Sequence, residues 1–488
     1  MRILLDTNIL IPLEDSSKAL EPHLARFHQL ATTNGHQLLV HPASRTDIER
    51  DQNAQRRAIT LSRLARYPIL DAPPRFAPTV ELLKLDNDGV DSEILFSLER
   101  NAASFLITED REIHNESSSR GLSDRVLYVQ QGVSLLERLH AVADVTFPNI
   151  QNVPIYTLNI KDRFFDSLRQ GYDQFDAWFA RSAQDGRSAW VYLEKDSPKA
   201  ICIYKREESP PINDDGRVLG GSVLKLCTFK VGEEVRGRRV GELFLKAAFQ
   251  YAYKNGLEHV YLTMVPDELH LMDLCVKYGF RDSGIYKGRD RVLVKDTPQA
   301  PPNSALSSLE YHVRYSPSIK ADGETRILLI PIQPRFHGLL FPEISSQFQL
   351  FADPIIGNGL ILAYLCHSKI KDIKAGDIVV FYRSGDLRKL TTVGVVESAF
   401  LSSDIDEILQ SVAKRTVYAY PDIKSMAQKT VRVVLFRLAF HLDNGPSASV
   451  LEEQGILKGP IQSIRNISIN AFKKIIDLAG VRSCFFAD

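Results

Sequence analysis

Four acidic residues in the first 110 positions stand at the ends of apolar segments, where folding can bring side chains together. Asp6 directly follows the run "ILL", and Asp110 comes just after "FLIT". Asp47 lies five residues after a proline, and Asp91 opens the stretch "DSEILFSL". Gathered carboxylates raise one another's pKa unless a cation lies among them, and oxygen ligands select Mg²⁺ or Mn²⁺. The set therefore predicts a metal site, although taken singly Asp47 and Asp91 are equally explained as helix N-caps and Asp110 as a turn residue.

The elements that must position these acids follow from the pattern of the first 145 residues. Short apolar segments, "RILL", "QLLV", "SFLIT" and "RVLYV", alternate there with longer helical stretches. This alternation is typical of a parallel α/β sheet. Ligands bind such sheets outside the carboxyl ends of the strands, so we expect Asp6 and Asp110 at one edge of the sheet.

The order and spacing of "LLDTNIL", an acid after a proline, "VDSEILFSL" and "LITEDREI" resemble the PIN nuclease domain over about residues 1–140. The resemblance implies that Asp6, Asp47, Asp91 and Asp110 hold one or two Mg²⁺ or Mn²⁺ ions, supported by Asn8 and Thr108. Such a metal would activate a water molecule for attack on a phosphodiester, usually of RNA.

A turn rich in arginine and glycine separates a strand from a helix in "FKVGEEVRGRRVGELFLKAAF". Backbone N–H groups at a helix N-terminus bind anions, and glycine lets a phosphate approach the backbone. Taken alone, the turn is better explained as a plain helix start with solvated arginines. With "YAYKNGLEHVYLTM" and "LCVKYGF" after it, the segment at about residues 155–285 resembles the GNAT N-acetyltransferases.

The GNAT resemblance implies an acetyl-CoA site around this turn, which the family writes Q/R-x-x-G-x-G/A. Arg239 stands where the family has its second-to-last glycine. Cys275 stands where many members place a tyrosine that protonates the leaving thiolate, so the resemblance supports cofactor binding more directly than catalysis. The predicted cofactor-binding residues are Val231, Arg236, Gly237, Arg238, Arg239, Val240 and Gly241.

The last third of the chain alternates strand patterns with basic and aromatic residues. "GNGLILAYLCHSKI", "AGDIVVFYRS" and "TTVGVVE" resemble the PUA-like superfamily, especially its ASCH and EVE modules, over about residues 325–488. The resemblance implies RNA or modified-base recognition, whereas an ordinary β surface would also carry lysine and arginine. The predicted nucleic-acid-binding residues are His367, Lys369, Tyr382, Arg383 and Ser384.

Length and composition agree with several folding units. At 488 residues the chain exceeds the roughly 250 to 300 residues of one core. We expect a multidomain α/β protein with a PIN-like parallel sheet at 1–145, a GNAT α+β fold at 150–298, a linker at 299–310 and a PUA-like small β-barrel at 311–488. The net charge is zero, so any nucleic-acid contact must use a local patch. Five scattered cysteines and the absence of a signal or membrane segment predict a cytoplasmic protein without membrane contact.

The modules together predict an RNA-directed enzyme. In this reading the PIN-like domain is a metal-dependent endoribonuclease, the GNAT-like domain binds acetyl-CoA and transfers acetyl groups, and the barrel selects the RNA. The fusion would suit a toxin or a defence protein, with room for a homo-oligomer or a regulatory protein partner. The alternative is a GNAT N-acetyltransferase acting on a protein or tRNA amine, with the other two domains as recruiting modules. A third reading is a binding regulator with both sites inert.

Overall fold

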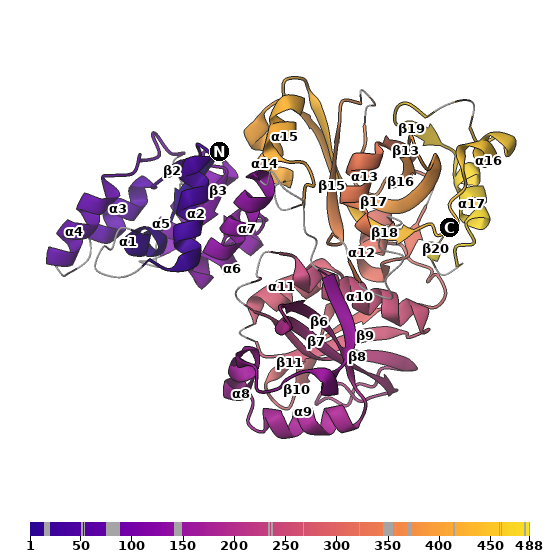
Figure 1. Cartoon of the computed structure of the whole chain (residues 1–488), viewed down its shortest axis with the longest axis horizontal. Coiled ribbons are helices and arrows are strands. Elements are labelled where there is room, and N and C mark those ends of the chain that lie inside the picture. Colours follow the sequence, from indigo (N-terminus) through magenta and orange to yellow (C-terminus); the bar gives the residue numbers. More distant parts are fainter. Residues whose placement is uncertain are drawn as a thin grey trace. The chain divides into compact units, whose positions relative to one another are not determined.

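The computed structural model groups the chain into two compact units, Met1–Asp144 with Ser402–Thr430 and Val145–Leu401 with Val431–Asp488. Figure 1 shows the course of the chain by colour. Among the helices that the structure describes, none is long and apolar enough to cross a membrane. The structure describes all residues except 14–19, 50–51, 53, 75–87, 141–148, 233–234, 236–237, 267, 322, 345–354, 357, 369, 371, 413–414, 458, 460, 483–484 and 488.

The first unit contains the predicted parallel sheet, with strand order β2-β1-β3-β4. Its central strands are short and apolar, and the side chains of Ile3 to Leu5 and of β3 are buried, as expected for strands covered on both faces. The strands are β1 (Arg2–Leu5), β2 (Gln37–Leu39), β3 (Phe105–Ile107) and β4 (Val126–Leu127). The helices are α1 (Thr7–Leu13), α2 (Pro22–Thr33), α3 (Pro42–Glu49), α4 (Ala54–Leu64), α5 (Asp88–Glu99), α6 (Arg111–Ser119) and α7 (Val129–His140).

A segment from late in the chain completes this first unit. It carries α14 (Ile405–Val412) and α15 (Tyr420–Met426). Arg415 forms an ion pair of 2.5 Å with Asp124. The rings of His36 and His140 pack against Tyr420, and their Nε2 atoms lie 2.7 Å apart. The insertion is therefore held by an ion pair and by ring contacts.

The second unit contains a mixed eight-stranded sheet with order β10-β11-β9-β8-β7-β6-β5-β14. Within it β8 and β9 pair in parallel, and the other described pairs are antiparallel. The strands are β5 (Asn149–Pro154), β6 (Ser188–Glu194), β7 (Ser197–Glu208), β8 (Ser222–Val231), β9 (His259–Met264), β10 (Arg281–Tyr286), β11 (Asp290–Asp296) and β14 (Ile355–Ile356).

Helices cover both faces of this mixed sheet. Successive strand residues point to opposite faces, so Ala189 and Val191 pack under α9 while Trp190 packs under α10. Figure 1 shows α9 and α10 on opposite sides of the strands. The elements are η2 (Ile155–Thr157), η3 (Arg163–Phe165), α8 (Asp166–Gly171), α9 (Phe175–Gln184), α10 (Val240–Lys254) and α11 (Leu269–Lys277).

The rest of the second unit is built on a six-stranded sheet with order β15-β18-β17-β16-β13-β19. Its closure into the small barrel that the PUA-like resemblance implies stays a prediction. The strands are β13 (Ile327–Ile332), β15 (Ile361–Cys366), β16 (Ile378–Arg383), β17 (Lys389–Ser402), β18 (Val431–His441) and β19 (Arg465–Ile467), with β12 (Ile319–Lys320) and β20 (Phe486–Ala487) as a separate pair. The helical elements are α12 (Ser308–Tyr315), α13 (Pro334–Leu340), η5 (Pro342–Ile344), α16 (Ala448–Glu453) and α17 (Ile469–Leu478).

Buried contacts join the two sheets of the second unit. The short strand β14 pairs with β5 and extends the mixed sheet. Lys246 on α10 is almost fully buried and forms a 2.5 Å ion pair with Glu343, which also accepts a 2.8 Å contact from His441 on β18. A buried ion pair holds the two packed elements in one relative position, because a shift that separates the pair would leave a buried charge uncompensated.

Candidate functional site

The central strands β8 and β9 separate partway along their length. They pair in parallel from Val223 and His259 to Leu226 and Leu262, and no further pairs join them in the part of the chain that the structure describes. Just beyond, the pairing of β7 with β8 shifts register at Cys227, which is the mark of a β-bulge. A bulge bends the strand that carries it. The sheet therefore opens at the carboxyl ends of its two parallel strands, where ligands bind α/β sheets.

A large cavity lies at this opening. Its volume is about 1630 Å³, above the roughly 300 to 1,000 Å³ of ordinary small-molecule sites, so it has room for two ligands. The ends of β8 and β9, the segment from η3 to α9 and the turn between β10 and β11 supply its walls. Ten Lys and Arg but five Asp and Glu line it, although the whole chain is neutral. The cavity therefore attracts anions.

Gly232 forms a close approach at the end of β8, beside this cavity. A Cβ atom at this position would lie 2.7 Å from the carbonyl oxygen of Lys199, so a side chain does not fit. Gly241, in the first turn of α10, would place a Cβ 3.0 Å from Leu274. The N-terminus of the 15-residue helix α10 supplies backbone N–H groups that suit a phosphate. These observations fit a nucleotide-type cofactor lying across the turn.

Arg239, immediately before α10, has an unusual backbone conformation for a residue other than glycine. Its φ of +63° lies in the left-handed region, which glycine adopts without cost. Its side chain does not extend freely toward a ligand, since the guanidinium bonds to Glu242 at 2.9 Å and to the carbonyl oxygen of Ile361. The arginine thus ties the start of α10 to β15.

The other predicted cofactor residues have different environments. Val231 lines the cavity. Arg238 is exposed and pairs with Glu194 at 2.7 Å, whereas Val240 is buried in the core under α10. Arg236 and Gly237 lie outside the described residues.

The separated parallel pair, the cavity and the glycine-rich turn together have the form of an acyltransferase site. Residues 152–280 match the model of the Acetyltransferase (GNAT) family. The chain therefore contains a GNAT acetyltransferase domain, as predicted, over residues 152–280. Among curated proteins none matches the chain.

Solved structures with partial similarity include two acetyltransferases and an ASCH protein. NAA60 from Arabidopsis thaliana, in complex with a bisubstrate analogue, is 15% identical over 30% of this chain and 97% of its own, with a TM-score of 0.24. An IAA acetyltransferase from Bacillus cereus is 18% identical over 30% and 97%, with a TM-score of 0.23. ASCH from Zymomonas mobilis is 10% identical over 31% and 94%, with a TM-score of 0.24.

The tyrosines that line the cavity are not the tyrosine close to Cys275, where the family has its catalytic tyrosine. Cys275 and Tyr278 are buried in the core on the α10 face, and burial raises the pKa of the Cys275 thiol. Among the described lining residues the tyrosines are Tyr172 and Tyr286. Burial raises the pKa of Tyr172, and Asp290 and Glu268 raise it further, which places two carboxylates near this phenol. The sequence contained no motif for this group, because its members come from separate turns.

Four of the residues predicted for the metal site gather in the first unit. Asp6 accepts hydrogen bonds from the Thr7 backbone N–H at 2.6 Å and from the Thr108 hydroxyl at 2.5 Å. Asn8 Nδ2 and the backbone N–H of Asp110 both donate to the same hydroxyl oxygen, at 3.2 and 3.0 Å. Burial raises the pKa of Asp6, and the nearby carboxylate of Asp110 adds to the effect. This edge of the sheet thus presents oxygen atoms of the kind that Mg²⁺ and Mn²⁺ prefer.

The remaining metal-site predictions are less complete. Asp110 also caps α6 by accepting from Glu112 N at 2.7 Å, which is the ordinary use of aspartate there. Asp91 is half-buried on α5, and the side chain of Asp47 on α3 lies outside the described residues. Within the described part of the chain, no group of three or more His, Cys, Asp or Glu side chains is arranged to hold a metal ion.

The residues predicted for nucleic-acid binding lie on and after two strands of the C-terminal sheet. Tyr382 is buried, and Arg383 pairs with Asp386 at 2.6 Å. Ser384 donates to the carbonyl oxygen of Ile332 at 3.0 Å. His367 is exposed after β15, and Lys369 lies outside the described residues.

One polar group beside these residues was not predicted from the sequence. His337 on α13 lies 2.9 Å from the Thr391 hydroxyl and 3.4 Å from Arg383. Burial, helped by Arg383, lowers the pKa of His337 to about 3. The ring is therefore neutral at physiological pH.

Proposed function

We propose that this protein is an acetyl-CoA-dependent N-acetyltransferase whose reaction takes place in the cavity between β8 and β9. The observation that carries the proposal is the separation of these strands beside the glycine turn, in a segment that belongs to the GNAT family. The cavity has room for a cofactor and an acceptor together.

The cofactor would lie along the part of β8 that faces the cavity beyond Leu226. Gly232 and the N-terminus of α10 would hold its phosphates, and the backbone from Cys227 to Val231 would orient its arm. Bound acetyl-CoA would supply an acetyl thioester to an amine, with a C–N bond formed, the C–S bond broken and coenzyme A leaving as a thiolate that takes up a proton. We propose that Glu268 or Asp290, which line the cavity near Tyr172, takes the proton that the amine must lose.

Acetyl-CoA binding is the first test. The wild type should gain thermal stability with acetyl-CoA, by about 2.7 kcal/mol at 100 times the dissociation constant. Gly232→Val should lose this gain, because the added side chain meets the Lys199 carbonyl. Gly220→Val is the matched control, since a Cβ there meets no atom within 4 Å. A wild type that does not respond to acetyl-CoA would overturn the proposal.

A second activity is favoured by the buried carboxylate of Asp6. Asp6 accepts its hydrogen bonds from neutral groups, and the charge that acts on it is the carboxylate of Asp110. A divalent cation between the two carboxylates would offset their electrostatic repulsion. We propose that Asp6 and Asp110, with Asp47 and Asp91, hold Mg²⁺ or Mn²⁺ for RNA cleavage, and that the C-terminal sheet selects the RNA through His367 and Arg383, while Tyr382 packs in the core.

Incubation of total RNA with the protein and Mn²⁺ or Mg²⁺ tests this second activity. Wild type should cut RNA in a metal-dependent way, and Asp6→Asn should not. Asp71→Asn, at an exposed position in the same unit, is the control. Cutting that persists in Asp6→Asn, or that needs no metal, would exclude this site as its source.

A further inference from the structure

Three cations from three neighbouring strand segments surround the bulge in β8. Arg187 precedes β6, Lys205 lies on β7 and Lys225 on β8, and all three line the cavity. The guanidinium of Arg187 lies 4.0 Å from the Cys227 sulfur. Burial raises the pKa of this thiol, while Arg187, Lys225 and Lys205 act in the opposite direction, so all three lie close to it. We call Arg187, Lys205 and Lys225 the basic cluster.

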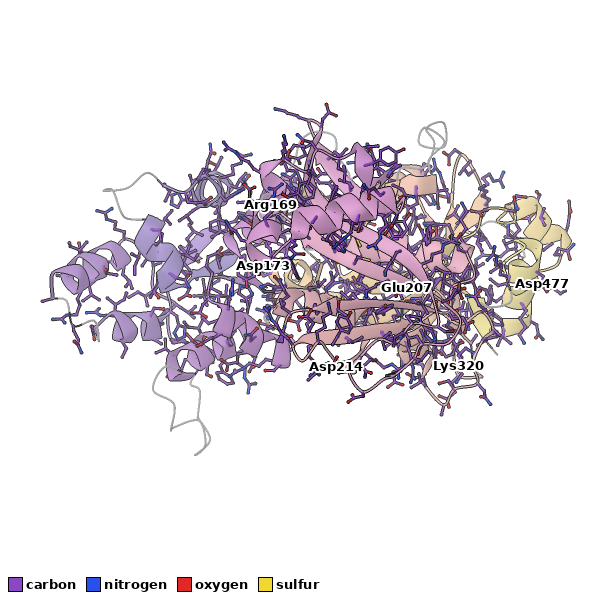
Figure 2. All side chains as sticks on the ribbon, turned by 90° about the horizontal axis from the view of Figure 1, so that it is seen from below. Arg169, Asp173, Glu207, Asp214, Lys320 and Asp477 are labelled. Atoms are coloured by element: carbon purple, nitrogen blue, oxygen red, sulfur yellow. The ribbon has the colours of Figure 1, made fainter. Side chains whose placement is uncertain are left out.

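The basic cluster keeps positive charge after its internal pairs are counted. Lys205 pairs with Glu207 on the same strand at 2.5 Å, and Figure 2 labels Glu207 on the sheet. Arg187 lies 3.3 Å from Asp185, whose side chain is 60% exposed, so water screens that pair. Lys225 forms no direct ion pair in the part of the chain that the structure describes, and the carboxylate close to it is Glu207, whose pKa it helps to lower while Lys205 and Tyr261 bond to the same group. One carboxylate is thus shared by two lysines.

Lys225 is instead held by aromatic faces. Its ammonium lies 5.1 Å from the centre of the Tyr261 ring and 5.5 Å from that of Tyr286. Rings in this position fix the direction of the ammonium but do not neutralise it. A half-buried cation directed into a cavity suits a ligand that brings the missing negative charge.

The phosphates of the cofactor are too distant to supply that charge. Cys227 precedes Gly232 by five residues, and at about 3.3 Å per residue the cluster lies roughly 16 Å along β8 from the phosphate turn. The cluster is therefore at the thioester end of the cavity, where the acceptor must lie. Elsewhere the wall carries the carboxylates Glu268 and Asp290 beside the cations Lys287 and Arg289, with Asp173 in the turn before α9 (Figure 2).

From this arrangement we propose that the acceptor is an amine carrying a phosphate group, with the phosphate bound by Arg187 and Lys225 and the amine directed toward the thioester. The proposal rests on the acetyltransferase function proposed above. Arginine and lysine beside aromatic rings are the groups that proteins use for phosphate. The carboxylates of Glu268 and Asp290, which line the same cavity, would bind the amine.

The test compares matched pairs of acceptors with and without phosphate. One pair is phosphoethanolamine and ethanolamine, and the other is a 5′-aminohexyl oligonucleotide and 6-aminohexanol. The dissociation constant of acetyl-CoA is measured in parallel, along with kcat/KM for transfer. The wild type should prefer the phosphorylated member of one pair by about tenfold or more, as a charge-assisted contact does. A preference in the first pair identifies a small phosphorylated amine as the acceptor, and a preference in the second pair identifies a nucleic acid.

Lys225→Met should remove this preference and leave acetyl-CoA affinity unchanged, while Lys254→Met, at an exposed position on α10, should keep both. Arg187→Met is the second variant and should also lose the preference for phosphorylated acceptors. If neither variant folds, the presence or absence of this preference in the wild type decides the inference. Equal transfer to both members of each pair, transfer to none by a protein that binds acetyl-CoA, or a preference that persists in Lys225→Met would overturn the inference only. Failure to bind acetyl-CoA would overturn the proposed function and this inference with it.

Discussion

Replacing Lys295 with methionine should change how the stability of the second unit depends on pH. Lys295 lies on β11 and is fully buried. Its ammonium nitrogen donates to the carbonyl oxygens of Val313 and Arg314 at 3.0 and 2.9 Å, in the last turn of α12. Burial lowers its pKa from the ordinary 10.5 to about 7. The residue therefore connects the acetyltransferase sheet to the C-terminal part through an amine that titrates near neutrality.

The size of the effect follows from proton linkage. Between pH 7 and 10.5 the unfolded chain keeps the proton on Lys295 while the native chain loses it, so the free energy of unfolding rises with pH. Each pH unit contributes about 1.4 kcal/mol, which gives about 2.7 kcal/mol between pH 7 and 9 and about 5 kcal/mol over the whole window. The carbonyl oxygens at the end of α12 favour the charged form, so these values are upper limits.

Urea unfolding at pH 7 and pH 9, followed by the fluorescence of the buried Trp190, measures this effect. The wild type should gain up to about 2.7 kcal/mol over Lys295→Met on going from pH 7 to 9. Lys254→Met, with an exposed lysine removed, should follow the wild type. A difference between wild type and Lys295→Met that stays constant with pH would show that the buried amine remains charged, and the reasoning would be wrong.

Two further predictions concern buried carboxylates. Without metal, Asp6→Asn should raise the melting temperature, because burial raises the pKa of Asp6 and the wild type loses stability as pH rises through that pKa. Each kcal/mol gained in the free energy of unfolding raises the melting temperature by about 2 to 4 °C. A lower melting temperature in calorimetry would contradict this. Burial opposes the charge of Glu343, but Lys246 and His441 outweigh it and lower its pKa to about 2. Glu343→Gln should cost about 3 to 5 kcal/mol in urea unfolding at pH 7, because it leaves Lys246 buried without its partner. The wild-type contribution should be present above pH 4.5 and disappear as pH falls toward 2. A cost no larger than that of Asp477→Asn, at an exposed position (Figure 2), would refute it.

Much of the fold, and the gathering of part of the predicted metal site, could be predicted because the sequence patterns that indicate them are local. An apolar run that ends in a polar residue places that residue at the edge of a parallel sheet, and this is where Asp6, Thr108 and Asp110 lie. The glycine-rich turn was equally local, since a tight turn before a helix requires particular backbone conformations. Arg239, which stands where the family has a glycine, has a left-handed backbone conformation that glycine adopts readily.

The basic cluster was not predictable, because its members are far apart in sequence and each looks like an ordinary solvated residue in an alternating strand. Their convergence depends on the register of β7 with β8, which sets Lys205 opposite Lys225 and which a single sequence does not reveal. The side-chain direction of Arg239 was also hidden, since it bonds to Ile361, more than one hundred residues away. The same holds for the segment 402–430, whose partners belong to the beginning of the chain.

That late segment has a consequence for how the protein is made. The first unit ends its main stretch at residue 144 but needs residues up to 430, so 286 further residues must be translated before its parts are all present. At about 5 to 20 residues per second this takes roughly 15 to 60 seconds. During that time His36, His140 and Asp124 await their partners Tyr420 and Arg415. A nascent chain of this protein is thus expected to need protection at its amino-terminal unit for most of its synthesis.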